Sequence, residues 1–192
     1  MNRVLPRTAL AVACALATLT AAACTSTDTG SPQPATSTTT SAASEVPKVV
    51  NPKTMKGIDA CQLLTAQQLQ TLGATGAPKK GSSPWGDADC TWSGDDVTIN
   101  LAPDTTTGAG LAQTYKKKSS FNGFQPTTVS SYPAVQVNKQ SLSCGLFLGV
   151  SDTQELSMTV FVEGQSNADY HNPCAFAPKV AAAVLGNLPA AL

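Results

Sequence analysis

Four cysteines carry the chemistry that this sequence makes easiest to predict: Cys61, Cys90, Cys144 and Cys174. An even number of thiols in an oxidising compartment favours two disulfides, and four cysteines allow three pairings. Cys61 and Cys174 are expected at helix starts, whereas Cys90 and Cys144 are expected in strands. We therefore favour the disulfides Cys61–Cys174 and Cys90–Cys144. A zinc site is the alternative, but no two of the four show the short C-x-x-C spacing of a tetrahedral site.

Cys24 ends a segment that has the features of an export signal. Arg3 and Arg7 precede an apolar run over residues 9–19, and three alanines stand directly before the cysteine. These features are typical of a secretory signal peptide, and small residues before a cysteine resemble the lipobox of bacterial lipoproteins. We expect residues 1–23 to be the signal peptide and Cys24 to carry a lipid anchor. The alternative is an ordinary secretory peptide that leaves an unpaired thiol.

A Ser-His-Asp hydrolase is not predicted from these residues. His171 is the only histidine of the chain, and it stands directly before an expected helix. A triad would have to be assembled from scattered residues such as Ser166, Asp169 and His171, which nothing in their spacing requires. We expect a loop or capping role for His171 and no enzymatic activity.

Two charged clusters of the sequence could contact a metal ion or a lipid. The aspartates around the first expected hairpin are Asp87, Asp89, Asp95 and Asp96. Carboxylates at that density can hold calcium, but the spacing is not that of an EF-hand and hairpin turns favour aspartate. Lysines 116–118 could contact anionic lipid headgroups, although such a triplet is more often a solvated helix end. We expect no metal ion and no cofactor.

Trp85 is the residue that we predict as a ligand or partner contact. It lies in a Gly/Ser/Pro-rich stretch, where its burial is not assured. An exposed tryptophan in such a loop can contact a hydrophobic ligand or a partner protein. Trp92, in contrast, shares a strand face with Cys90 and is expected to pack in the core.

Hydrophobic periodicity predicts an α+β domain: an antiparallel sheet with N- and C-terminal helices packed on one face, stapled by two disulfides. Thr65 and Gln68 form a capping box at the start of the first helix. The expected elements are a helix over 66–72, strands over 90–93 and 97–101, a helix over 107–118, a strand over 132–138, strands over 144–150 and 156–162, and a helix over 172–188.

The amino-acid composition predicts a tether followed by a domain, and it argues against a nucleic-acid partner. Residues 24–57 are rich in Ser, Thr and Pro and cannot bury enough apolar surface to offset the entropy of ordering. We therefore expect a disordered tether over 24–57 and one domain over 58–192. No arginine follows Arg7, so the guanidinium contacts typical of phosphate recognition are missing from the mature chain and no nucleic-acid partner is expected.

Several short motifs resemble one protein family. They are DACQLLT at 59–65, CTW at 90–92, YPA at 132–134, Cys144, and PC at 173–174 before the last helix. Together they resemble the DUF3558 family of actinobacterial lipoproteins over nearly all of residues 59–188. The resemblance implies the envelope of a high-GC Gram-positive bacterium and carries no assigned activity.

These observations predict the cellular location of the protein more specifically than its activity. We expect a lipoprotein on the extracytoplasmic face of the cell membrane, held there through Cys24. Its domain is expected to be a non-catalytic binding or accessory module for an envelope component or a partner protein. Two alternatives stay open: an enzyme acting on cell-wall or lipid substrates, and a structural surface protein without a dedicated ligand.

Overall fold

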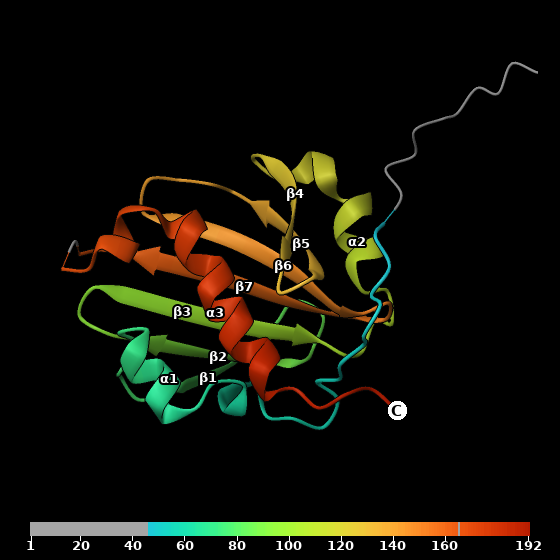
Figure 1. Cartoon of the computed structure of the whole chain (residues 1–192), viewed down its shortest axis with the longest axis horizontal. Helices are drawn as coiled ribbons and strands as arrows, with labels where there is room; N and C mark the ends of the chain where they lie inside the picture. The colour runs from blue at the N-terminus through green and yellow to red at the C-terminus, as the bar shows by residue number, and fades with distance from the viewer. Residues whose placement is uncertain (1–45, 165) are drawn as a thin grey trace, which may run out of the picture. The chain divides into compact units, whose positions relative to one another are not determined.

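One antiparallel sheet of seven strands organises residues 46–164 and 166–192, which are the part of the chain that the computed structural model describes. The strand order is β1-β2-β3-β7-β6-β5-β4 (Figure 1). The strands are β1 (Lys79–Ser82), β2 (Ala88–Ser93), β3 (Val97–Asp104), β4 (Phe124–Val129), β5 (Tyr132–Val137), β6 (Ser143–Ser151) and β7 (Gln154–Val162). The predicted α+β class with an antiparallel sheet is confirmed.

Helices from both ends of the domain cover one face of this sheet. They are the 3₁₀ helix η1 (Ala60–Gln62), α1 (Ala66–Thr71) and α3 (Pro173–Asn187). Figure 1 shows α3 lying across the sheet, where it contacts β6 and β7. Alternate side chains of these strands, such as Leu146 and Met158, are at most 1% exposed beneath it. The predicted packing of the N- and C-terminal helices on one face is confirmed.

The short helix α2 (Leu111–Lys116) and the 3₁₀ turn η2 (Lys118–Ser120) lie on the opposite face. Phe147 alternates with Leu146 and Leu148 along β6 and therefore points to that face. It packs there with Leu111 and Tyr115 of α2, in a second apolar cluster that is separate from the main core. α2 thus covers part of this second face, next to β5 and β6. The remaining short turn, η3 (Ala168–His171), precedes α3.

The four domain cysteines form two disulfides, but the predicted pairing is wrong. The bonds are Cys61–Cys90 and Cys144–Cys174, each with Cα atoms 5.1 Å apart. Strands β2 and β6 are three positions apart in the sheet, with β3 and β7 between them. At about 4.8 Å per strand, Cys90 and Cys144 are about 14 Å apart, too far for a disulfide. Each helix-start cysteine instead bonds to the strand cysteine beneath it.

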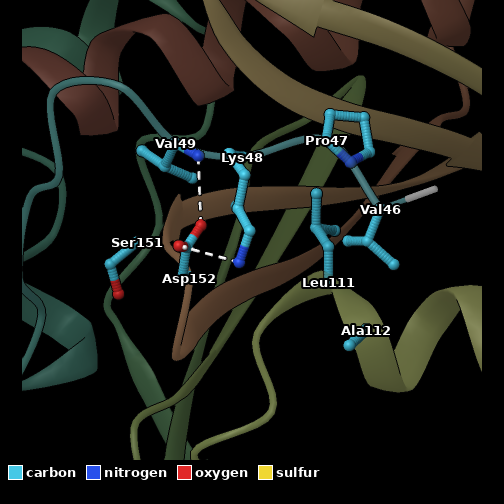
Figure 2. Close-up of a pocket in the computed structure, with 9 residues that line it drawn as sticks. Val46, Pro47, Lys48, Val49, Leu111, Ala112, Ser151 and Asp152 are labelled. Atoms are coloured by element: carbon cyan, nitrogen blue, oxygen red, sulfur yellow. Dashed lines mark hydrogen bonds and ion pairs between the residues drawn. The ribbon is translucent and has the colours of Figure 1, made fainter.

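The predicted boundary at residue 57 also needs correction. Residues 46–57, here called the N-terminal strap, pack on the domain rather than continuing the tether. The Val49 amide and the Lys48 ammonium both bond to the Asp152 carboxylate, at 3.1 and 3.2 Å (Figure 2). Met55 is only 1% exposed. The strap is ordered because Met55 is buried and the strap backbone forms hydrogen bonds with the domain, and the average composition of residues 24–57 does not reveal these contacts. Residues 24–45 lie outside the described part of the chain.

Candidate ligand-binding pocket

A cavity of about 370 Å³ opens on the face of the sheet that carries α2. Its walls include three aromatic side chains, two carboxylates and one lysine: Trp85, Phe121, Phe147, Asp104, Glu155 and Lys117. We call it the aromatic–carboxylate pocket. Apolar walls with a few polar groups inside are the usual composition of a small-molecule site.

Glu155 is the buried acid of this pocket. It lies in β7 directly opposite Asp104 of β3, and it is only 3% exposed. The Thr114 hydroxyl lies 3.0 and 2.8 Å from its two oxygens. Burial raises the pKa of Glu155 from its ordinary value of 4.5 to about 7, and the negative charge of Asp104 acts in the same direction. The Thr114 hydrogen bond and the charge of Lys117 oppose this shift without cancelling it.

Asp104 has a different role because its oxygens are already occupied. Its carboxylate accepts hydrogen bonds from the amides of Thr106 and Thr107, at 3.2 and 3.0 Å. The Thr107 hydroxyl donates a third, at 2.6 Å. Aspartate commonly closes a turn in this way. The side chain of Asp104 is therefore fixed at the end of β3, where it places negative charge next to Glu155.

The turn between β1 and β2 carries Trp85 to the pocket. This turn is closed by a backbone hydrogen bond of 2.8 Å from the Ser83 amide to the Asp87 carbonyl. The indole Nε1 of Trp85 donates to the Pro103 carbonyl at 2.8 Å. The Asp87 carboxylate accepts from the Thr105 amide at 2.7 Å, which joins the turn to the segment after β3. The Nε1 edge of the indole is thus anchored, while the side chain stays partly exposed.

Two glycines let α2 approach the sheet closely enough to form the roof. A Cβ on Gly149 of β6 would lie 2.9 Å from Leu111 Cδ1, so glycine leaves the space that Leu111 fills. Gly110 precedes the helix with a φ of +51°, and a Cβ there would lie 2.5 Å from the Asp152 carbonyl oxygen. The absence of a side chain at both positions lets the start of α2 lie against β6 and the β6–β7 turn, with Thr114 next to Glu155.

A family model described as a protein of unknown function, DUF3558, matches residues 19–187. The chain belongs to the DUF3558 family. The matched region includes all four domain cysteines and the whole aromatic–carboxylate pocket. No curated protein and no solved structure shows significant similarity to this DUF3558 chain.

The structure of this DUF3558 domain brings only part of the predicted site residues together. Trp85, which the sequence singled out, lines the pocket. Asp104, Glu155 and Thr114 were not predicted. Cys24 lies outside the described residues, and among those residues no helix is both long and apolar enough to cross a membrane.

Ser166 and Asp169, two candidate residues for a hydrolase triad, have other partners. The Ser166 hydroxyl bonds to Asp96, and Asp169 forms an ion pair of 2.6 Å with Lys179. His171 is an exposed residue that ends η3. The structure therefore separates these side chains among different partners and does not assemble them into a triad.

The charged clusters of the sequence also have local partners. Asp87 holds the turn described above, and Asp96 bonds to Ser166. Within residues 46–164 and 166–192, no three acidic, imidazole or thiol groups gather where they could hold a metal ion. Lysines 116–118 are exposed where α2 passes into η2, and Lys117 lines the aromatic–carboxylate pocket.

Two other hollows of the DUF3558 domain suit a ligand less well. A wider one of about 530 Å³ lies between α1 and α3, and its lining is mostly polar side chains of the helix surfaces, such as Gln67 and Lys179. The hollow in Figure 2 measures about 80 Å³ and is lined by the N-terminal strap, with Val46 near Leu111. Neither combines aromatic walls with a buried ionisable group.

Proposed function

We propose that this DUF3558 protein is a lipid-anchored, extracytoplasmic module of the bacterial envelope that binds a ligand without converting it. The signal-like segment before Cys24 supports the anchor, and the DUF3558 match begins upstream of that cysteine. The N-terminal strap, which follows the predicted tether in the chain, packs beside the β6–β7 turn. A lipid on Cys24 would hold the domain near the membrane.

The aromatic–carboxylate pocket is the observation that carries the binding role. Burying a carboxylate costs free energy, and the raised pKa of Glu155 is the sign of that cost. A buried carboxyl group therefore lowers the stability of the fold unless a packing or binding role offsets the cost of its burial. Trp85, a large aromatic side chain that stays partly exposed on the β1–β2 turn, lines the same pocket.

Retention of a compound from the native envelope tests this role. We expect the full-length protein, incubated with a small-molecule extract of that envelope and washed, to keep a compound that native mass spectrometry detects. Trp85→Ala should reduce retention at least about tenfold, because an aromatic wall of the pocket is removed. Gln67→Ala, in the hollow between α1 and α3, is the matched control and should retain the compound fully. Equal retention by both variants would place the site elsewhere.

An enzyme acting on cell-wall or lipid substrates is the second candidate, and Glu155 is the observation that favours it. A carboxyl group with a pKa of about 7 can donate or accept a proton near neutral pH, as a general acid or base does. The three hydrogen bonds already made to Asp104 argue against a second free carboxylate. Conversion of the retained compound by the wild type and not by Glu155→Gln would favour the enzyme over the binding module.

A further inference from the structure

Acidic groups outnumber basic groups in the lining of the aromatic–carboxylate pocket. Asp104 and Glu155 face each other across β3 and β7, and Lys117 follows α2 at the rim. The turn that brings Pro84 and Trp85 adds no charge, and Phe147 of β6 adds none. When both carboxyl groups are ionised, the lining therefore carries one net negative charge. The lysine is exposed and hydrated, whereas both acids are at most 3% exposed, so the interior is more negative than the rim.

The carboxylate of Glu155 can also accept further hydrogen bonds from a ligand. The Thr114 hydroxyl has one proton, and it lies within 3.0 Å of both oxygens of the carboxylate, so it supplies a single hydrogen bond. An ionised carboxylate can accept about four. A donor that enters the cavity can therefore bond to Glu155 without displacing Thr114.

The aromatic walls suit the same kind of ligand. Trp85, Phe121 and Phe147 present ring faces or edges to a cavity that already contains buried negative charge. Ring faces attract cations, and tryptophan attracts them most strongly. The apolar part of a ligand would gain from burial against the same rings.

We infer that the ligand of the aromatic–carboxylate pocket is an organic cation, whose ammonium group pairs with Glu155 next to Asp104 and whose apolar part packs against Trp85, Phe121 and Phe147. This inference rests on the proposed binding function and names the chemical class of its ligand. A neutral apolar compound would bring no counter-charge to the two buried carboxylates. An anion would face both of them, and only the hydrated Lys117 would attract it.

Binding of a cation at this position must compete with a proton. Glu155 is mostly protonated at about pH 5 and mostly ionised at about pH 8, because burial raises its pKa to about 7. Asp104 from β3 disfavours its ionisation, and Lys117 favours it. The ammonium group pairs with the ionised form, so binding releases a proton. We expect affinity at least about tenfold weaker at about pH 5 than at about pH 8.

Titration calorimetry with two matched probes tests the inference on the full-length protein. The probes are 2-phenylethylammonium and its uncharged counterpart 2-phenylethanol, which share the ring and the two-carbon chain. We expect the ammonium to bind at least about tenfold more tightly than the alcohol at about pH 8. Glu155→Gln, which keeps the shape of the side chain, should remove this preference and the pH dependence. Gln67→Ala should change neither, and circular dichroism checks that both variants fold.

Other results of the calorimetry would overturn the ammonium inference. Equal affinity for the two probes, lost in Trp85→Ala, would overturn the ammonium inference and leave the pocket as the binding site. Absence of binding by either probe would also overturn it. The proposed function would then still be judged by its own test, the Trp85-dependent retention of an envelope compound. Ammonium binding that Glu155→Gln leaves unchanged would show that the cation binds elsewhere.

Discussion

Replacing both Cys144 and Cys174 by alanine is expected to lower the free energy of unfolding by about 3.5 kcal/mol. The disulfide joins β6 to the first turn of α3 and spans 30 residues. A cross-link of that length restricts the unfolded chain by about this amount in the chain-entropy model. Without it, α3 is held on the sheet by apolar contacts and by the hydrogen bond of 2.6 Å that Gln136 Nε2 donates to the Cys174 carbonyl. Equilibrium urea denaturation without reductant measures the change.

The matched control for this pair is Cys61→Ala with Cys90→Ala, because that bond closes a nearly equal span of 29 residues. The two double variants should lose similar stability and show no free thiols among the domain cysteines. Replacing Cys90 and Cys144 together would instead break both disulfides and leave Cys61 and Cys174 as free thiols. A stable protein without domain thiols in that last variant would contradict the pairing.

Glu155 is expected to make stability fall as the pH rises through neutrality. Its pKa in the folded protein, about 7, lies above its ordinary value of 4.5, so the folded state binds the proton more tightly. The corresponding stability is fully present below about pH 4.5 and is lost as the pH rises through about 7. A shift of that size corresponds to about 3 kcal/mol.

Glu155→Gln isolates this contribution, because glutamine cannot ionise. We expect the variant to exceed the wild type by about 3 kcal/mol in free energy of unfolding at about pH 8 and to differ by less than about 1 kcal/mol at about pH 5. Urea denaturation of both proteins at the two pH values measures the difference. Parallel pH profiles for the two proteins would contradict a buried, protonated Glu155.

Local sequence patterns predicted much of the fold because the elements with strong periodicity are local. The alternation along β6 and β7 and the apolar stripe of α3 each depend on neighbouring residues alone. The capping box of Thr65 and Gln68 is likewise a contact within one turn, and both of its hydrogen bonds are present. Strand β1 was missed because all four of its residues are exposed, so it has no alternating pattern.

The disulfide pairing and most of the pocket could not be predicted because they depend on strand order. Only the sheet shows that β3 and β7 separate Cys90 from Cys144. Glu155 alternates with Leu156 along β7, which is the pattern of a residue facing solvent. It is buried because α2 covers that end of the face, and no local pattern shows which face α2 selects. Trp85 drew attention in the sequence because a large aromatic side chain is unusual in a Gly/Ser/Pro-rich loop, and it lines the pocket.

Native mass spectrometry of the protein isolated from its own membrane in mild detergent tests the proposed anchored binding module most directly. The account predicts a chain that begins at Cys24, carries a diacyl or triacyl modification there, and contains two disulfides. It also predicts an additional bound compound that is released on denaturation and missing from Trp85→Ala. A chain with an unmodified N-terminus and no bound compound, found in the soluble fraction, would contradict both the anchor and the binding role.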